Sequence, residues 1–255
     1  IWWSPDYYVI ATAGQSNMVG GGDGGAQELN GNVQAYNPVT GEIVDSAYGQ
    51  PFNVKDERNN LYLHMANELS DSLGRPVLVV TGAVAGSSMD LWLETGTGTL
   101  WDQLQDRVTA ALALIGQDHV DSFLWLQGEG NYPTPLATYQ AMMLSLFAQV
   151  RGQDWAQDDI ALLIGELSHE GMNSAQNQTL QALEIALKDD PYLRFISSTG
   201  LDTTALDGVH FTGDALVEYG HRFYQALQDI LNGVPPVEQQ APVLHLAANA
   251  PTQIT

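Results

Sequence analysis

The sequence predicts an α/β fold in which a central parallel sheet of about five strands carries helices on both faces. Apolar runs of strand length alternate with longer stretches in which apolar residues recur every three or four positions. This strand-then-helix pattern occurs five times, and strands joined through helices pair in parallel. A chain of 255 residues is long enough for one sizeable core. We therefore expect one domain over residues 1–232, followed by an extended tail over residues 233–255.

The expected elements follow one another along the whole domain. The five strands are the apolar runs Tyr8–Ala13, Val77–Thr81, Phe123–Gln127, Ile160–Gly165 and Leu193–Ser197. The five helices are the stretches of three- and four-residue spacing, Leu61–Leu73, Leu100–Ile115, Leu136–Val150, Ser174–Leu187 and Asp214–Leu231. Beyond Gly233 four prolines predict an extended segment, either a linker to a further module or a strap packed on the domain.

Composition excludes several classes of partner. Eight basic residues stand against 30 acidic ones, a formal net charge of -22, which opposes binding to nucleic acid or to an anionic membrane surface. No apolar run approaches the length that spans a membrane. The absence of cysteine excludes a disulfide framework and a thiolate-ligated metal. The first six residues lack a basic, signal-like start, and we expect a processed N-terminus and a secreted or extracellular protein.

A hydroxyl follows the first expected strand, and an acid-imidazole pair lies near the end of the chain. Ser16 stands in Gly14-Gln15-Ser16-Asn17, while Asp207 precedes His210 by three residues. In an open parallel sheet, ligands bind beyond the carboxyl ends of the strands, where Ser16 falls. Serine, aspartate and histidine in this order are typical of an acyl-transfer triad. Asp202 is a weaker candidate for the acid, and orientation of His210 by backbone alone is a further alternative.

Two further loops are expected at the same edge of the sheet. The small residues after the second strand allow the backbone amide of Gly86 to approach a ligand closely. After the third strand comes Gln127-Gly128-Glu129-Gly130-Asn131, where Gln127 offers an amide N–H to a developing oxyanion. Each feature also has an ordinary structural interpretation, with Gly86 as a turn glycine and Gln127 and Glu129 as groups that cap loop backbone.

Other catalytic signatures do not fit. The α/β-hydrolase elbow requires Gly-x-Ser-x-Gly, and Met18 stands at the last position here. The glycine cluster at residues 20–25 is not followed by the Lys-Ser or Lys-Thr of a phosphate loop. His169-Glu170 lacks the second histidine of a helical zinc motif, and the remaining histidines have no ligand-like spacing. The sequence therefore calls for no metal and no cofactor.

Together the blocks around Ser16, Gln127 and His210 resemble the SGNH hydrolase superfamily, and specifically the carbohydrate esterases of the sialate O-acetylesterase and acetylxylan esterase kind. The resemblance covers almost the whole domain. It implies a three-layer flavodoxin-like fold, Ser16 as nucleophile, His210 as base and Asp207 as its partner. It also implies an oxyanion hole made by the Ser16 and Gly86 amides with Gln127. The residues expected to bind substrate or support the site are Gln15, Asn17, Arg58, Trp92, Glu129 and Asn131.

The expected function is that of a serine esterase that removes O-acetyl groups from carbohydrates through an acyl-enzyme. Only Lys55 and Arg58 lie in a loop that reaches the site, so neutral acetylated sugars such as xylan are favoured over acetylated sialic acid. Two alternatives remain. A glycoside hydrolase would use two carboxylates among Asp90, Glu129 and Glu166. A non-catalytic glycan-binding module would stack sugars on Trp92, Trp101 and Tyr132, although such rings are more often core.

Overall fold

The computed structural model describes residues 6–21, 29–46, 59–169, 174–205 and 207–236. These residues form one seven-stranded sheet in the order β3-β2-β4-β1-β5-β6-β7. The strands are β1 (Tyr8–Gly14), β2 (Val33–Asn37), β3 (Glu42–Asp45), β4 (Val77–Thr81), β5 (Val120–Leu126), β6 (Ala156–Gly165) and β7 (Leu193–Ile196). All neighbours pair in parallel except β2 and β3, which are antiparallel.

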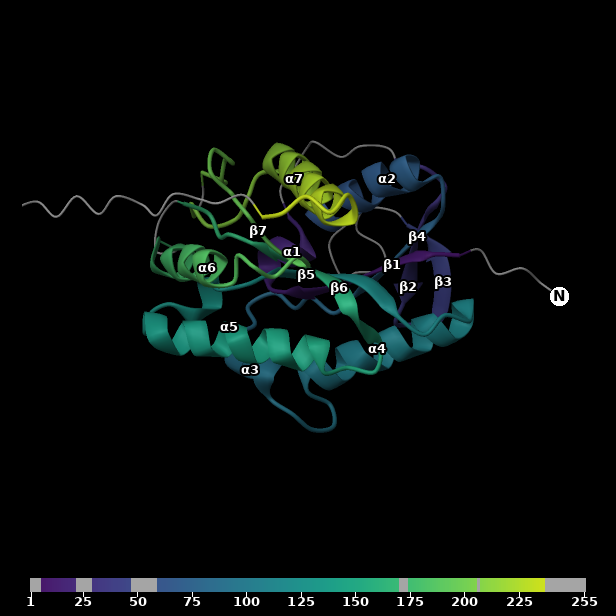
Figure 1. Cartoon of the computed structure of the whole chain (residues 1–255), viewed down its shortest axis with the longest axis horizontal. Coiled ribbons are helices and arrows are strands. Elements are labelled where there is room, and N and C mark those ends of the chain that lie inside the picture. Colours follow the sequence, from purple (N-terminus) through teal and green to yellow (C-terminus); the bar gives the residue numbers. More distant parts are fainter. Residues whose placement is uncertain (1–5, 22–28, 47–58, 170–173, 206, 237–255) are drawn as a thin grey trace, which may run out of the picture.

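Helices cover both faces of this sheet, which gives three layers (Figure 1). The helical segments are α1 (Ser16–Val19), α2 (Leu61–Leu73), α3 (Met89–Leu93), α4 (Leu100–Ile115), the 3₁₀ turn η1 (Glu129–Asn131), α5 (Leu136–Arg151), α6 (Ser174–Ala186) and α7 (Gly213–Leu231). Val9 and Ala11 of β1 pack toward the cluster that includes α3 to α6, whereas Tyr8 and Ile10 pack toward α2 and α7. Successive residues of β1 therefore serve two cores, as expected for a strand buried on both faces.

The predicted fold class is confirmed, and the five expected strands and five expected helices are all present. The strand count was too low, because β2 and β3 were not expected. β3 lies at the sheet edge with its residues half-buried or exposed, and β2 carries polar Gln34 and Asn37. Strands of this kind do not produce the continuous apolar run that marked the buried ones. β6 begins at Ala156, four residues before the predicted start at Ile160. The prediction missed these residues because Gln157–Asp159 are polar and exposed and do not belong to the apolar run.

Helices α2 and α7 lie side by side on one face of the sheet (Figure 1). Their close approach depends on Gly220, since a Cβ there would lie 2.5 Å from the Leu61 carbonyl oxygen and 2.7 Å from the His64 Cβ. No helix in the described part of the chain is long and apolar enough to cross a membrane. The expected tail falls mostly on residues 237–255, which lie outside the described residues.

Candidate active site

The backbone at Gly14 places Ser16 at the carboxyl edge of the sheet. Gly14 ends β1 with a φ of +136°, and a Cβ at this position would lie 2.1 Å from the Leu126 carbonyl oxygen of β5. Only glycine fits this conformation and this contact. The Gln15 amide then donates to the same carbonyl at 3.0 Å, and Ser16 begins the short helix α1. The chain thus leaves the sheet between β4 and β5, where open α/β sheets bind their ligands.

Three of the predicted residues form a hydrogen-bonded line. His210 Nε2 lies 2.9 Å from Ser16 Oγ, and His210 Nδ1 lies 2.7 Å from Asp207 Oδ2. The second carboxylate oxygen of Asp207 accepts from the backbone amides of Val209 at 2.9 Å and His210 at 3.0 Å. Hydrogen bonding from the His210 side chain holds the pKa of the Asp207 carboxyl well below its usual range, with a further contribution from the backbone amides. Asp207 is therefore an ionised acceptor that orients the imidazole.

The alternative acid, Asp202, has a different place in the structure. Its backbone carbonyl accepts from the Thr212 amide at 3.0 Å, and no hydrogen bond joins its side chain to His210 in the described residues. A residue that the sequence did not single out, Thr204, donates from Oγ1 to Asp207 Oδ1 at 3.1 Å. No local sequence pattern marks Thr204, because the loop conformation alone brings it to the carboxylate.

The loop after β4 is hydrogen-bonded to Gly14, at the end of β1. The Val84 amide donates to the Gly14 carbonyl oxygen at 3.0 Å, and Ser87 Oγ donates to the same oxygen at 3.3 Å. Gly86 lies between them with a φ of +75° and is exposed. Among the described residues, its amide donates to no backbone or side-chain acceptor. The loop thus presents a free N–H beside the carboxyl end of β1.

Gln127 has a different environment from the one expected of an oxyanion donor. Its side chain is buried, and Nε2 has acceptors at Asn131 Oδ1 (2.6 Å), the Ser87 carbonyl (3.1 Å) and Gln15 Oε1 (3.3 Å). The two amide hydrogens are thus committed to internal partners. In this geometry Gln127 clamps three loops together and leaves no N–H for a substrate oxygen. Ser87, which the sequence did not mark, is part of this clamp.

The remaining predicted residues that the structure describes are buried beside the site or in the core behind it. Asn17 and Asn131 are buried, and so is the Glu129 carboxyl group, whose pKa is raised by burial. Trp92 takes the supporting position of the two that were expected, because its indole is fully buried and donates to Ser87 Oγ at 2.9 Å. Its ring packs on Trp125 in the core.

The aromatic rings considered for sugar contact differ in exposure. Trp101 is also a core residue, whereas Tyr132 is 49% exposed. Lys55 and Arg58 lie outside the described residues. In the described ranges, no group of three or more His, Cys, Asp or Glu side chains is arranged to hold a metal ion.

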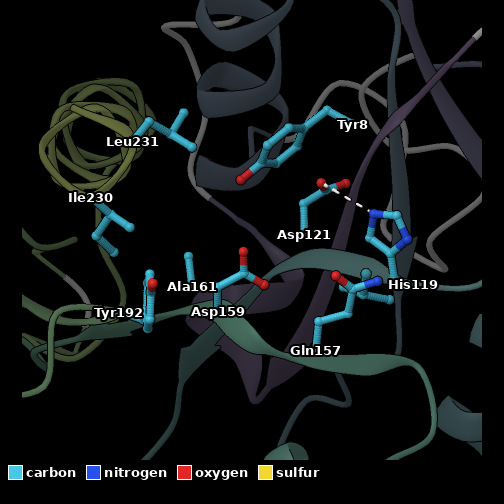
Figure 2. Close-up of a pocket in the computed structure, with 10 residues that line it drawn as sticks. Tyr8, His119, Asp121, Gln157, Asp159, Ala161, Tyr192, Ile230 and Leu231 are labelled. Carbon is cyan, nitrogen blue, oxygen red and sulfur yellow. Dashed lines mark ion pairs between the residues drawn. The ribbon is translucent and has the colours of Figure 1, made fainter. Parts of the chain in front are cut away.

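A separate cavity of about 270 Å³, whose lining is drawn in Figure 2, lies near the amino-terminal ends of the strands. Tyr8, Asp121 and Asp159, from the amino-terminal parts of β1, β5 and β6, contribute to its wall. None of the predicted site residues lines it. The Ser16 site and this cavity are therefore distinct parts of the molecule.

Comparison with known proteins gives one family and several related structures. The family model described as carbohydrate esterase, sialic acid-specific acetylesterase, matches residues 6–229. A protein from Arabidopsis thaliana is 17% identical, with a TM-score of 0.73 over 88% of this chain and 100% of that one. NanS is 18% identical, with a TM-score of 0.62 over 90% of this chain and 99% of that one. A carbohydrate acetylesterase from Xanthomonas citri is 17% identical, with a TM-score of 0.64 over 88% of this chain and 57% of that one. No curated protein matches the chain.

Proposed function

Because the chain belongs to the carbohydrate esterase family of sialic acid-specific acetylesterases, we propose that Ser16, His210 and Asp207 remove O-acetyl groups from carbohydrates through an acyl-enzyme. The observation that carries this proposal is the continuous hydrogen-bonded line from Asp207 through His210 to Ser16 Oγ at the carboxyl edge of the sheet. A serine hydroxyl needs such a base, because it is a weak nucleophile at its free pKa.

The reaction proceeds in two halves. His210 Nε2 takes the Ser16 proton as Oγ bonds to the acetyl carbonyl carbon, and Asp207 stabilises the resulting imidazolium. When the tetrahedral intermediate collapses, the bond from carbon to the sugar oxygen breaks and the imidazolium protonates that oxygen. Water then attacks the acetyl-Ser16 carbonyl while His210 accepts its proton, and acetate leaves as Ser16 regains its hydrogen.

Two backbone amides are suited to stabilise the oxyanion. The amides of Ser16 and Gly86 donate to no acceptor within the described residues, and both lie next to the carboxyl end of β1. Donors fixed in this way need no reorganisation when the negative charge develops. We assign Gln127 to the support of this arrangement, because its hydrogen bonds hold Gln15, Ser87 and Asn131 together.

The substrate that we propose is an acetyl ester on a neutral sugar, such as acetylated xylan. An anionic sugar requires a local cation to overcome the negative field of the protein. Every arginine in the described ranges is held by a carboxylate or a backbone carbonyl: Arg75, Arg107, Arg151, Arg194 and Arg222. The description of the family model favours sialic acid as the second candidate, and that assignment would need Lys55 or Arg58 at the site.

A secreted or extracellular location agrees with this substrate, since polymeric glycans such as xylan do not cross membranes. We also propose residues 1–232 as the catalytic domain, with residues 233–255 as the extended tail. Neither nucleic acid nor an anionic membrane surface is an expected partner, because the net charge is -22.

The test is the loss of acetate release in Ser16→Ala. We expect this variant to fold normally and to lose nearly all activity on a chromogenic acetate ester and on acetylated xylan. A serine-directed organophosphorus reagent should label Ser16 in the wild-type protein, as read by mass spectrometry of the peptide. Labelling confined to Ser87 or Ser88 would contradict the assignment of the nucleophile.

A further inference from the structure

Asn17 contacts the backbone on both sides of His210. Its Oδ1 accepts from the Phe211 amide at 3.1 Å, and its Nδ2 donates to the Val209 carbonyl at 3.1 Å. The side chain of Asn17 is buried, so water does not compete for these groups. A single side chain next to the nucleophile therefore fixes the segment that carries the base.

Glu129 sets which way the Asn17 amide points. Glu129 Oε1 accepts from Asn17 Nδ2 at 2.6 Å, and the other carboxylate oxygen is buried without a partner in the described part of the chain. A carboxylate oxygen at this position accepts from the amide nitrogen and repels the amide oxygen. The flipped amide would also turn its oxygen toward the Val209 carbonyl and its nitrogen toward the Phe211 N–H. Glu129 and the two backbone groups thus select the same orientation.

We propose that Asn17 is a positioning residue that holds His210 against Ser16, and that Glu129 acts through it by orienting its amide. The inference rests on the proposed function, because it concerns the same nucleophile and base. The side chain of His210 is 44% exposed, so its position depends largely on the backbone that carries it. A displacement of a catalytic group by about 1 Å costs on the order of 10²-fold in rate. Two hydrogen bonds to the flanking backbone restrict such a displacement.

The first experiment compares Asn17→Ala with Asn177→Ala. Asn177 is the matched control, because it is also buried and also holds loop backbone, through the Leu167 amide and the Leu167 and Ser168 carbonyls. We expect Asn17→Ala to lower kcat by about 10²-fold while KM changes by less than about threefold. The rate at which an organophosphorus reagent labels Ser16 should fall by a similar factor. Asn177→Ala should lower the melting temperature and keep kcat within about threefold of the wild type.

Equal kcat losses in the two variants would overturn the proposal, because they would reflect general loop loosening. A kcat for Asn17→Ala within about threefold of the wild type would overturn it as well. These outcomes are separate from failure of the proposed function, which is decided by the activity of Ser16→Ala in otherwise wild-type protein.

The second experiment tests the part assigned to Glu129. In Asn17→Asp an oxygen replaces Nδ2 and faces both Glu129 and the Val209 carbonyl, so we expect a kcat loss at least as large as in Asn17→Ala. Adding Glu129→Gln restores a donor opposite the new oxygen, and kcat should rise about tenfold or more above that of Asn17→Asp. Glu129→Gln alone completes the double-mutant cycle and should lower kcat less than Asn17→Asp does. A double variant no more active than Asn17→Asp would remove Glu129 from the proposal.

Discussion

Two residues beside Ser16 determine its surroundings in different ways. Gly14 lets the backbone pass close to β5, because a Cβ there would lie only 2.1 Å from the Leu126 carbonyl oxygen, and so sets where the chain leaves the sheet. Asn17 binds the backbone around His210, and so sets where the base lies. The site therefore depends on the lack of a side chain at Gly14 and on the buried side-chain amide of Asn17.

The pH dependence of activity tests the role of Asp207. A histidine base must be neutral to accept a proton, and imidazoles ordinarily titrate at about pH 6.5. We expect kcat/KM to be lost at acid pH, where the base is protonated. In Asp207→Asn this dependence should persist with a maximum lower by about 10⁴-fold, because the orienting carboxylate is lost while His210 remains. Substantial activity with the same pH profile in His210→Ala would exclude His210 as the base.

Gln127→Ala distinguishes a clamp from an oxyanion donor. Removing the amide takes one donor from each of the Asn131, Ser87 and Gln15 oxygens, of which the first and last keep a backbone amide, so we expect the free energy of unfolding to fall by about 1–3 kcal/mol. Denaturant unfolding measures this loss, and steady-state kinetics measure kcat on the same preparation. A variant of unchanged stability whose kcat falls by about 10²- to 10³-fold would instead favour direct donation to the oxyanion.

Between helices, the contact of α2 with α7 encloses an ionisable group. Gly220 brings the helix axes close, and the ring of His64 is buried beneath them with Nε2 3.2 Å from Asn59 Oδ1. Burial lowers the pKa of His64 from 6.5 to about 4. The folded protein therefore keeps this imidazole neutral at a pH where the unfolded chain protonates it.

This difference in pKa makes stability depend on pH. The unfolded state binds more protons between pH 6.5 and about 4, so the contribution of His64 is present above pH 6.5 and is lost as the pH falls toward 4. At about 1.4 kcal/mol per pKa unit, the loss amounts to about 3 kcal/mol. Between pH 7 and pH 4 the free energy of unfolding should fall in both proteins, and the fall should be about 3 kcal/mol smaller in His64→Gln than in the wild type. Denaturant unfolding at the two pH values measures this difference. Parallel stability curves for the two proteins would contradict the assignment.

For the whole molecule, the net charge of -22 acts on every approaching ligand. Clusters of charges of one sign create an electrostatic potential that extends over the protein surface and weakens as salt is added. The arginines of the described ranges are already paired or bonded to backbone carbonyls. The molecule as a whole is thus better suited to neutral glycans than to anionic ones.

Comparison of kcat/KM on acetylated xylan and on acetylated sialic acid, at low and high salt, measures this preference. We expect the neutral substrate to be preferred, and activity on the sialic acid to increase as salt screens the repulsion. A preference for the sialic acid that weakens with salt and disappears in Arg58→Ala would overturn the substrate assignment. The esterase chemistry would be unaffected by that result.

The sequence by itself determined the five buried strands and the five long helices. It also identified Ser16, Asp207 and His210 as candidates for a catalytic triad. Buried strands and amphipathic helices leave a periodic apolar pattern, and chemically reactive residue types can be recognised wherever they stand. The sequence did not reveal the edge strand β3 or its neighbour β2, since an exposed edge strand and a strand interrupted by polar residues leave no such pattern.

Only the tertiary structure decided which polar groups face one another. Gln127 was expected to donate to the substrate, yet its amide is committed to Asn131, Ser87 and Gln15. Trp92 was a candidate either for substrate contact or for support, and its place in the core decides for support. The bonds from Asn17 join residues 192 and 194 positions apart in the chain. Such partners depend on loop geometry and on hydrogen bonds between distant segments, and neither is encoded in the periodicity of one segment.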